Sequence, residues 1–193
     1  MLKKNKLEGI SIPEKERAYE KILAWFFAYP SKEFSLNELC RALDISKKST
    51  NEIILQLEKD GFIHKEVVGK LWRIRANPKH IYFITKKIPQ NIMHVYEGGI
   101  IEWINSNIPN AKAVILFGSY RWGEDIEGSD LDIAVEILGN EPPRIINLTM
   151  GKLGYKENVK INLFIFSRNY IDLNVFSNIA NGITLQGFLE VRI

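Results

Sequence analysis

The chain contains few of the residues that most often bind transition metals, with one cysteine and three histidines among 193 residues. The single Cys40 excludes an internal disulfide and a cysteine-rich zinc site. His64, His80 and His94 show no metal-ligand spacing, so we expect them to be surface or packing residues.

Long apolar runs are also missing. No stretch approaches the roughly 20 apolar residues that a membrane-spanning helix needs. The first nine residues, MLKKNKLEG, lack the apolar centre of a signal peptide. Hydrophobic content of 46% and charged content of 25% are typical of a water-soluble globular protein. We therefore expect a cytoplasmic protein with no membrane partner.

Charge is distributed unevenly along the chain. Residues 1–89 contain 18 Lys and Arg against 11 Asp and Glu, a balance of +7, whereas residues 90–193 contain 8 against 12, a balance of −4. A basic first half and an acidic second half indicate two domains with different partners. The first half suits a polyanion, and the second would need metal ions to bind one.

The most informative segment is 113–136, AVILFGSYRWGEDIEGSDLDIAVE. An apolar run at 113–117 predicts a strand that ends at Gly118 and Ser119, and a second predicted strand contains Asp130 and Asp132. Side chains alternate along a strand, so these two aspartates point the same way. Two neighbouring carboxylates repel one another, and a hard cation such as Mg²⁺ relieves that repulsion while leaving positions for substrate phosphates. Glycine allows a ligand to approach the backbone, and free N–H groups at the start of a following helix attract anions. The segment therefore predicts a site for metal and phosphate.

This segment has a pattern of Gly118-Ser119, ten further residues and then Asp130-x-Asp132. The pattern resembles the signature of the DNA polymerase beta-like nucleotidyltransferase superfamily, in particular its minimal nucleotidyltransferases. The resemblance covers about residues 90–190. It implies that Asp130 and Asp132 bind Mg²⁺ and are catalytic, and that a hydroxyl displaces pyrophosphate from a nucleoside triphosphate, with ATP as the expected nucleotide. The residues expected to bind the nucleotide are Gly118, Ser119, Arg121 and Ser129. Arg121 can equally be a surface arginine of the loop, and the two acids can be merely solvated.

One position departs from the family pattern. A third carboxylate usually stands on a later strand, here predicted at 159–166, and Asn162 occupies its place. Asparagine can offer a carbonyl oxygen to a metal, but it is neutral and cannot take up a proton. Glu136 and Glu157 are nearby in sequence, although neither is at the matching position. Metal and nucleotide binding are therefore better supported than turnover.

The first half resembles a winged helix-turn-helix domain. Apolar residues at helical spacing from Ala18 end before Pro30, Ser35 can cap a second helix, and Ser46 can cap a third. Two alternating runs joined at Gly69 and Lys70 predict a hairpin. This resemblance implies a third helix that enters the DNA major groove and a hairpin that contacts phosphates. The implied DNA-binding residues are Lys47, Lys48, Ser49, Asn51, Lys70 and Arg73. A solvated basic face on a domain used for docking or dimerisation is the alternative.

These observations predict an α+β protein in three parts: a winged helix-turn-helix domain at 1–80, a packed linker or strand at 81–89, and a nucleotidyltransferase fold at 90–193, a small mixed sheet flanked by helices. The favoured function is a Mg²⁺-dependent nucleotidyltransferase with a DNA-binding domain. Minimal nucleotidyltransferases often act as antitoxins that modify a partner toxin, so a protein acceptor is one expectation. The alternative is a DNA-binding transcriptional regulator whose nucleotidyltransferase domain has become a nucleotide sensor or docking platform. A homodimer is left open.

Overall fold

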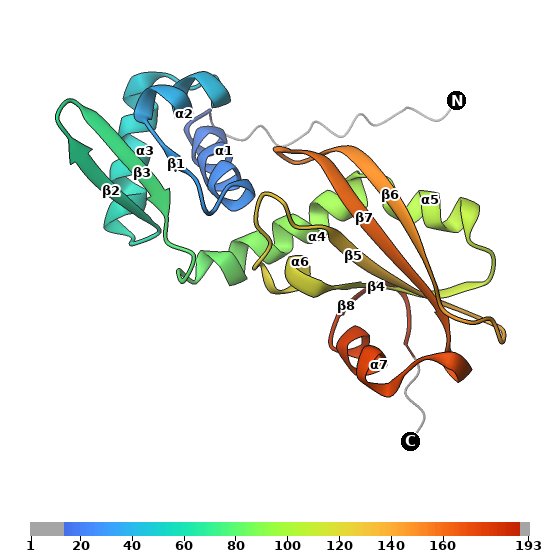
Figure 1. The fold of residues 1–193 in the computed structure, drawn as a ribbon. Helices are drawn as coiled ribbons and strands as arrows, with labels where there is room; N and C mark the ends of the chain where they lie inside the picture. The colour runs from blue at the N-terminus through green and yellow to red at the C-terminus, as the bar shows by residue number, and fades with distance from the viewer. Residues whose placement is uncertain (1–13, 190–193) are drawn as a thin grey trace, which may run out of the picture.

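Two units follow one another along the chain in the computed structural model, which describes residues 14–189 (Figure 1). We call residues 14–76 the N-terminal unit, residues 77–87 the connecting segment and residues 88–189 the C-terminal unit. Together they form a mixed α+β structure with seven α-helices and two sheets in the described range. None of these helices has both the length and the apolar character required to cross a bilayer.

The N-terminal unit packs three helices against a small antiparallel sheet with the strand order β1-β3-β2. Its elements are α1 (Glu14–Ala28), β1 (Glu33–Phe34), α2 (Leu36–Leu43), α3 (Lys47–Lys59), β2 (Ile63–Val68) and β3 (Leu71–Ala76). The expected helix starts are confirmed: Ser35 and Glu38 form a capping box on α2, and the Ser46 side chain accepts a hydrogen bond from the Ser49 amide. The predicted hairpin is also confirmed, whereas the short β1 was not predicted.

The connecting segment contains no strand and is packed only in part, because Phe83 is buried whereas Ile81 and Ile84 are exposed. It ends in a π-helical turn, η1 (Phe83–Lys87), that continues directly into α4 (Ile88–Glu97). Phe83 is buried in the core of the N-terminal unit, which explains why this apolar stretch can lie between the units. Gly99, with a φ of +72°, separates α4 from α5 (Ile100–Asn107) and lets the second helix start in a new direction.

The C-terminal unit is built on a five-stranded mixed sheet with the order β6-β7-β5-β4-β8. Its strands are β4 (Ala111–Phe117), β5 (Leu131–Ile137), β6 (Arg144–Leu153), β7 (Lys156–Ser167) and β8 (Ile183–Gly187). Only β5 and β7 pair in parallel, and β6, which was not predicted, forms one edge. The remaining elements are the short helices α6 (Gly118–Trp122), η2 (Arg168–Tyr170) and α7 (Leu173–Ala180).

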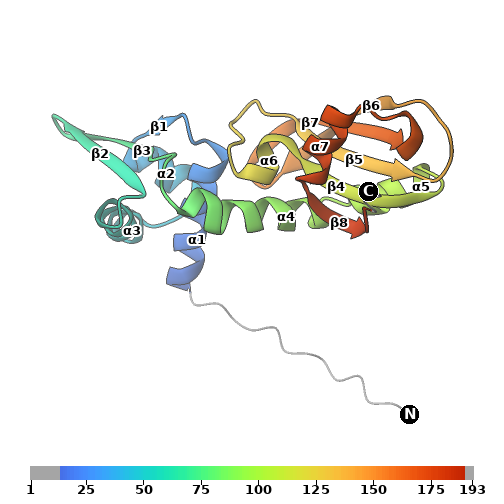
Figure 2. The ribbon, with the colours of Figure 1, turned by 90° about the horizontal axis from the view of Figure 1, so that it is seen from below.

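Helices lie on both faces of this sheet (Figure 2). On one face α4 and α5 contribute to the main core, which includes Val95, Ile104 and Leu131. On the other face α7 covers a smaller cluster that includes Ala134 and Phe166. Because residues alternate along β5, Asp132 points to the same side of the sheet as Ala134, beyond the edge of that cluster.

The two units share aromatic packing. Tyr155, in the turn between β6 and β7, packs against the core of the N-terminal unit, with its ring 5.3 Å from that of Trp25. The Tyr29 hydroxyl donates to the Tyr155 carbonyl oxygen over 2.7 Å. The relative position of the units is therefore held by partly buried aromatic side chains as well as by the chain connection.

Candidate active site

The turn between β4 and α6 lies directly against the predicted metal-binding acids. Gly118 has a φ of +70°, and a Cβ atom at this residue would stand 2.5 Å from Asp132 Oδ2. The pairing of Phe117 with Asp132 in the β4–β5 ladder causes this approach. The two halves of the motif, ten residues apart in sequence, therefore form one site.

Asp130 and Asp132 converge on a single point. Asp130 immediately precedes β5, and Asp132 is its second residue. The Nδ2 atom of Asn162, on the neighbouring strand β7, lies 2.9 Å from Asp132 Oδ1 and 3.4 Å from Asp130 Oδ2. One nitrogen can donate toward both carboxylates only if both face the same place.

The environment of Asp132 favours its protonated form. Burial raises the pKa of this carboxyl above its ordinary value, and the charge of Asp130 raises it further, while the hydrogen bond from Asn162 acts in the opposite direction. A positive charge between the two acids would oppose this shift, because it favours the ionised form of both carboxyl groups.

Asn162 occupies the position expected from the sequence, since it pairs with Asp132 in the parallel β5–β7 ladder. Its amide nitrogen, not its carbonyl oxygen, faces the acids. It therefore acts here as a donor to the carboxylates, and the carbonyl oxygen would reach a shared cation only after the amide rotates. Glu136 does not replace it, because this buried carboxylate pairs with Arg168 over 2.8 Å. Glu157 lies at the far end of β7, opposite Lys152.

The donor set can be compared with the needs of Mg²⁺. Within residues 14–189 no group of three or more His, Cys, Asp or Glu side chains is arranged to hold a metal ion. Mg²⁺ commonly binds one or two carboxylates and completes its shell with water and substrate phosphates. Two convergent aspartates beside an accessible glycine turn fit that requirement.

The other predicted nucleotide ligands are partly engaged elsewhere. Arg121 donates from Nε to the Asn181 carbonyl oxygen over 2.8 Å and stacks on the ring of Trp122. Ser129 Oγ accepts a hydrogen bond from the Ile126 amide and so closes the loop before Asp130. Ser119 is the second residue of α6, next to the Gly118 contact.

A buried charged cluster lies beside the site and was not foreseen. Asp125, which is 1% exposed, is flanked by the ammonium groups of Lys87 and Lys156 at 3.2 and 2.6 Å. These residues come from the connecting segment, from the loop between α6 and β5, and from the start of β7. Each looks like an ordinary surface charge in the sequence, so no sequence signal indicates the cluster.

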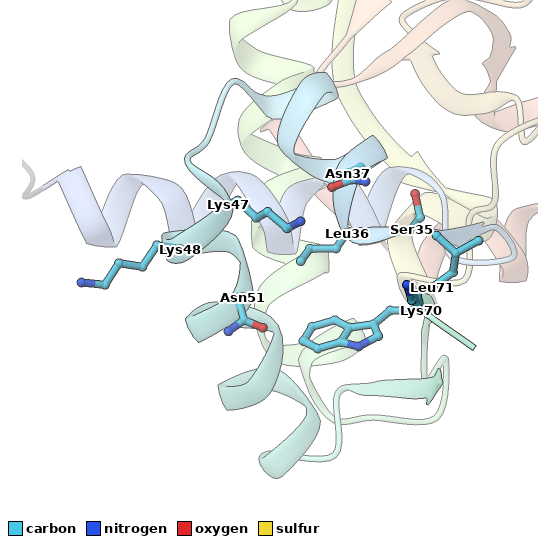
Figure 3. Close-up of a pocket in the computed structure, with 9 residues that line it drawn as sticks. Ser35, Leu36, Asn37, Lys47, Lys48, Asn51, Lys70 and Leu71 are labelled. Carbon is cyan, nitrogen blue, oxygen red and sulfur yellow. The ribbon is translucent and has the colours of Figure 1, made fainter. Parts of the chain in front are cut away.

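A concave region of about 540 Å³ lies in the N-terminal unit between α2, α3 and the hairpin. We call it the basic groove. It is lined by Ser35, Leu36, Asn37, Lys47, Lys48, Asn51, Lys70, Leu71 and Trp72. Figure 3 shows the Lys47 side chain extending toward Leu36, whereas Lys48 points outward.

Four of the predicted DNA-binding residues thus gather in or at this groove, namely Lys47, Lys48, Asn51 and Lys70. Ser49 instead helps to cap α3, through bonds with Ser46. Arg73 is not among the lining residues. Its backbone is opposite that of Glu66 in the β2–β3 ladder, and because side chains alternate along a strand it lies on the opposite face from Trp72.

Residues 99–177 match the family model of the nucleotidyltransferase domain. The match includes the glycine turn, both aspartates and Asn162. It supports the nucleotidyltransferase superfamily for the C-terminal unit and a nucleotidyl-transfer activity in general terms. No curated protein matches the chain.

Proposed function

We propose that the protein is a Mg²⁺-dependent nucleotidyltransferase that uses a nucleoside triphosphate, with ATP as the first candidate. The observation that carries the proposal is the convergence of Asp130 and Asp132 on one point in direct contact with Gly118. A turn without a side chain gives the phosphates access to the backbone, and the two acids lie where a cation can reach those phosphates.

The transfer consists of bond formation between an acceptor hydroxyl oxygen and the α-phosphorus, with loss of pyrophosphate. Mg²⁺, when bound, neutralises charge on the phosphates. Asp130 and Asp132 would hold the Mg²⁺, and the Gly118–Ser119 turn would orient the pyrophosphate portion. Asn162 cannot accept the hydroxyl proton, so that proton passes to the acceptor's own groups or to solvent.

The experiment is incubation with labelled ATP, Mg²⁺ and candidate acceptors, with a protein acceptor as the first class. Wild type is compared with Asp130→Ala/Asp132→Ala. Label transfer by wild type alone supports the proposal. Transfer no greater than that of the double variant on every acceptor, together with no Mg²⁺-dependent binding of ATP in calorimetry, refutes it.

The basic groove favours a second function, binding of duplex DNA by a winged helix-turn-helix domain. Three lysines line the groove, and so does Asn51 of α3, a residue type that can read an adenine edge. Combined with Asn162, this raises the alternative of a regulator whose nucleotide site only senses its ligand. Asn162→Asp separates the two: a large gain of transfer activity indicates a degenerate site, whereas an active wild type excludes the alternative.

A further inference from the structure

The loop formed by residues 123–129 connects the two halves of the nucleotide site. It begins where α6 ends, four residues after Ser119, and it ends at Asp130. A change in the loop conformation would therefore move the first acid relative to the glycine turn. The contacts that fix this loop decide whether one nucleotide can reach both.

Lys156 holds the loop from the first residue of β7. Its ammonium group donates to Asp125 Oδ2 at 2.6 Å, to the Ile126 carbonyl oxygen at 2.8 Å and to the Tyr120 hydroxyl at 3.2 Å. All three donor positions of the ammonium group are thus used on α6 and on the loop. The side chain is 5% exposed, so water competes little for these bonds.

Two further residues complete the buried cluster. Asn91 on α4 donates from Nδ2 to Asp125 Oδ1 at 2.8 Å and to the Tyr120 carbonyl oxygen at 3.0 Å. Lys87 pairs with the same carboxylate and also donates to the Asp125 carbonyl oxygen. With two lysines for one carboxylate, loss of either lysine still leaves a charge-balanced pair.

The N-terminal unit holds the same loop from outside. The Ser31 amide and hydroxyl donate to the two oxygens of Glu127 at 3.2 and 2.7 Å. Burial alone would raise the pKa of Glu127, but the bonds from Ser31 bring it below its ordinary value. Tyr29 meanwhile contacts Tyr155, the neighbour of Lys156. The unit thus contacts both the loop and the turn that carries the lysine.

We propose that Lys156 and Ser31 are positioning residues for the nucleotide site, acting through the loop at 123–129 on Asp130. The inference rests on the proposed function and adds to it that the N-terminal unit controls the geometry of the site. Neither residue touches the metal-binding acids in any described contact. They therefore act on the nucleotide site indirectly, by holding the loop and with it Asp130 in position before the nucleotide binds.

The test measures the Kd of ATP in excess Mg²⁺ by calorimetry and the amide hydrogen exchange of residues 123–129. Lys156→Met keeps the side-chain length and leaves Asp125 paired with Lys87, so the variant should fold. We expect about tenfold weaker binding, equivalent to one or two hydrogen bonds, and faster exchange across the loop. Lys152→Met, an exposed change on β6, and Ile54→Val, a mild core change in the N-terminal unit, should leave both readouts as in wild type.

Ser31→Ala provides a second variant that leaves the core untouched. We expect about threefold weaker binding, as for one exposed hydrogen bond, and faster exchange around Glu127. Binding within twofold of wild type in Lys156→Met, with unchanged exchange, overturns the inference. If wild type binds no nucleotide, the proposed function fails, and the exchange data alone decide the positioning: faster exchange in Lys156→Met supports it and unchanged exchange overturns it.

Discussion

The Oδ2 atom of Asp132 lies where a side chain at Gly118 would begin, 2.5 Å from the position of a Cβ atom. The acid belongs to β5 and the glycine begins α6, and the carboxylate uses the space that a side chain at Gly118 would need. Glycine is required at this position for two reasons: a side chain would collide with Asp132, and a φ of +70° disfavours other residues.

Gly118→Ala should weaken nucleotide binding and destabilise the fold. The added methyl group forces the Asp132 carboxylate away, and the left-handed backbone costs about 1 kcal/mol or more. We expect at least tenfold weaker Mg²⁺-ATP binding in calorimetry and a lower thermal midpoint. Gly151→Ala is the matched control, since no atom lies within 4 Å of a Cβ there. Equal behaviour of the two variants would contradict the geometry.

Asn162→Asp should make stability depend on Mg²⁺. The change replaces the amide donor by a third carboxylate next to Asp130 and Asp132, so repulsion should cost about 1–3 kcal/mol in chelator at neutral pH. Excess Mg²⁺ should restore the thermal midpoint, whereas wild type should respond much less. A midpoint in Asn162→Asp that is the same with chelator and with Mg²⁺ would show that the three side chains do not share a cation.

Lys87 should give the free energy of unfolding a distinct pH dependence. Burial lowers the pKa of Lys87 from 10.5 to about 8, with Asp125 opposing the shift only in part. Between these values the unfolded chain retains a proton that the folded protein has released, so the contribution of Lys87 to stability rises with pH in this window. Below about pH 8 the buried charge is a cost to the fold.

Urea unfolding of wild type and Lys87→Met tests this sign. Between about pH 7 and about pH 10.5 the unfolding free energy of wild type should rise relative to that of Lys87→Met by up to about 3 kcal/mol. Lys152→Met, at an exposed position, should stay parallel to wild type over the same range. If the stability of wild type relative to Lys87→Met falls or stays constant as the pH rises, Lys87 is not the group that titrates in this range.

If the basic groove binds duplex DNA, its lysines should make that binding salt-dependent. Lys47→Ala, Lys48→Ala and Lys70→Ala should each lower the slope of log affinity against log salt by about 0.9 if each contacts one phosphate of duplex DNA. Fluorescence anisotropy with a labelled duplex measures the slope. Arg73→Ala is the control, because Arg73 lies on the other face of the hairpin. An unchanged slope in the triple lysine variant would argue for docking or dimerisation instead.

Local signals in the sequence predicted much of the fold. The caps at Ser35 and Ser46 and the hairpin turn depend on neighbouring residues only, and all three were found. The edge strand β6 was missed even though Ile146, Leu148 and Met150 alternate with exposed residues. The connecting segment formed a helix where a strand was one expectation, because Phe83 is buried in the N-terminal core.

The candidate site was only partly predictable. The spacing of Gly118, Asp130 and Asp132 indicates their shared role, since two adjacent strands bring the motif together. The orientation of the Asn162 amide and the burial of Lys156 depend on neighbours 30 or more residues away in sequence. Contacts between residues so far apart leave no periodic pattern in the sequence. A lysine that will be buried therefore looks the same in the sequence as a lysine that will face solvent.

Tyr155 has a consequence for any attempt to separate the two units. Its ring belongs to the C-terminal unit by sequence but completes the aromatic core around Trp25 and Tyr29. A shortened protein that starts at α4 would leave this tyrosine in water, and one that stops before α4 would uncover the apolar surface that the ring normally shields. Chimaeras made by exchanging N-terminal units among related proteins should therefore fail unless the β6–β7 turn is exchanged as well.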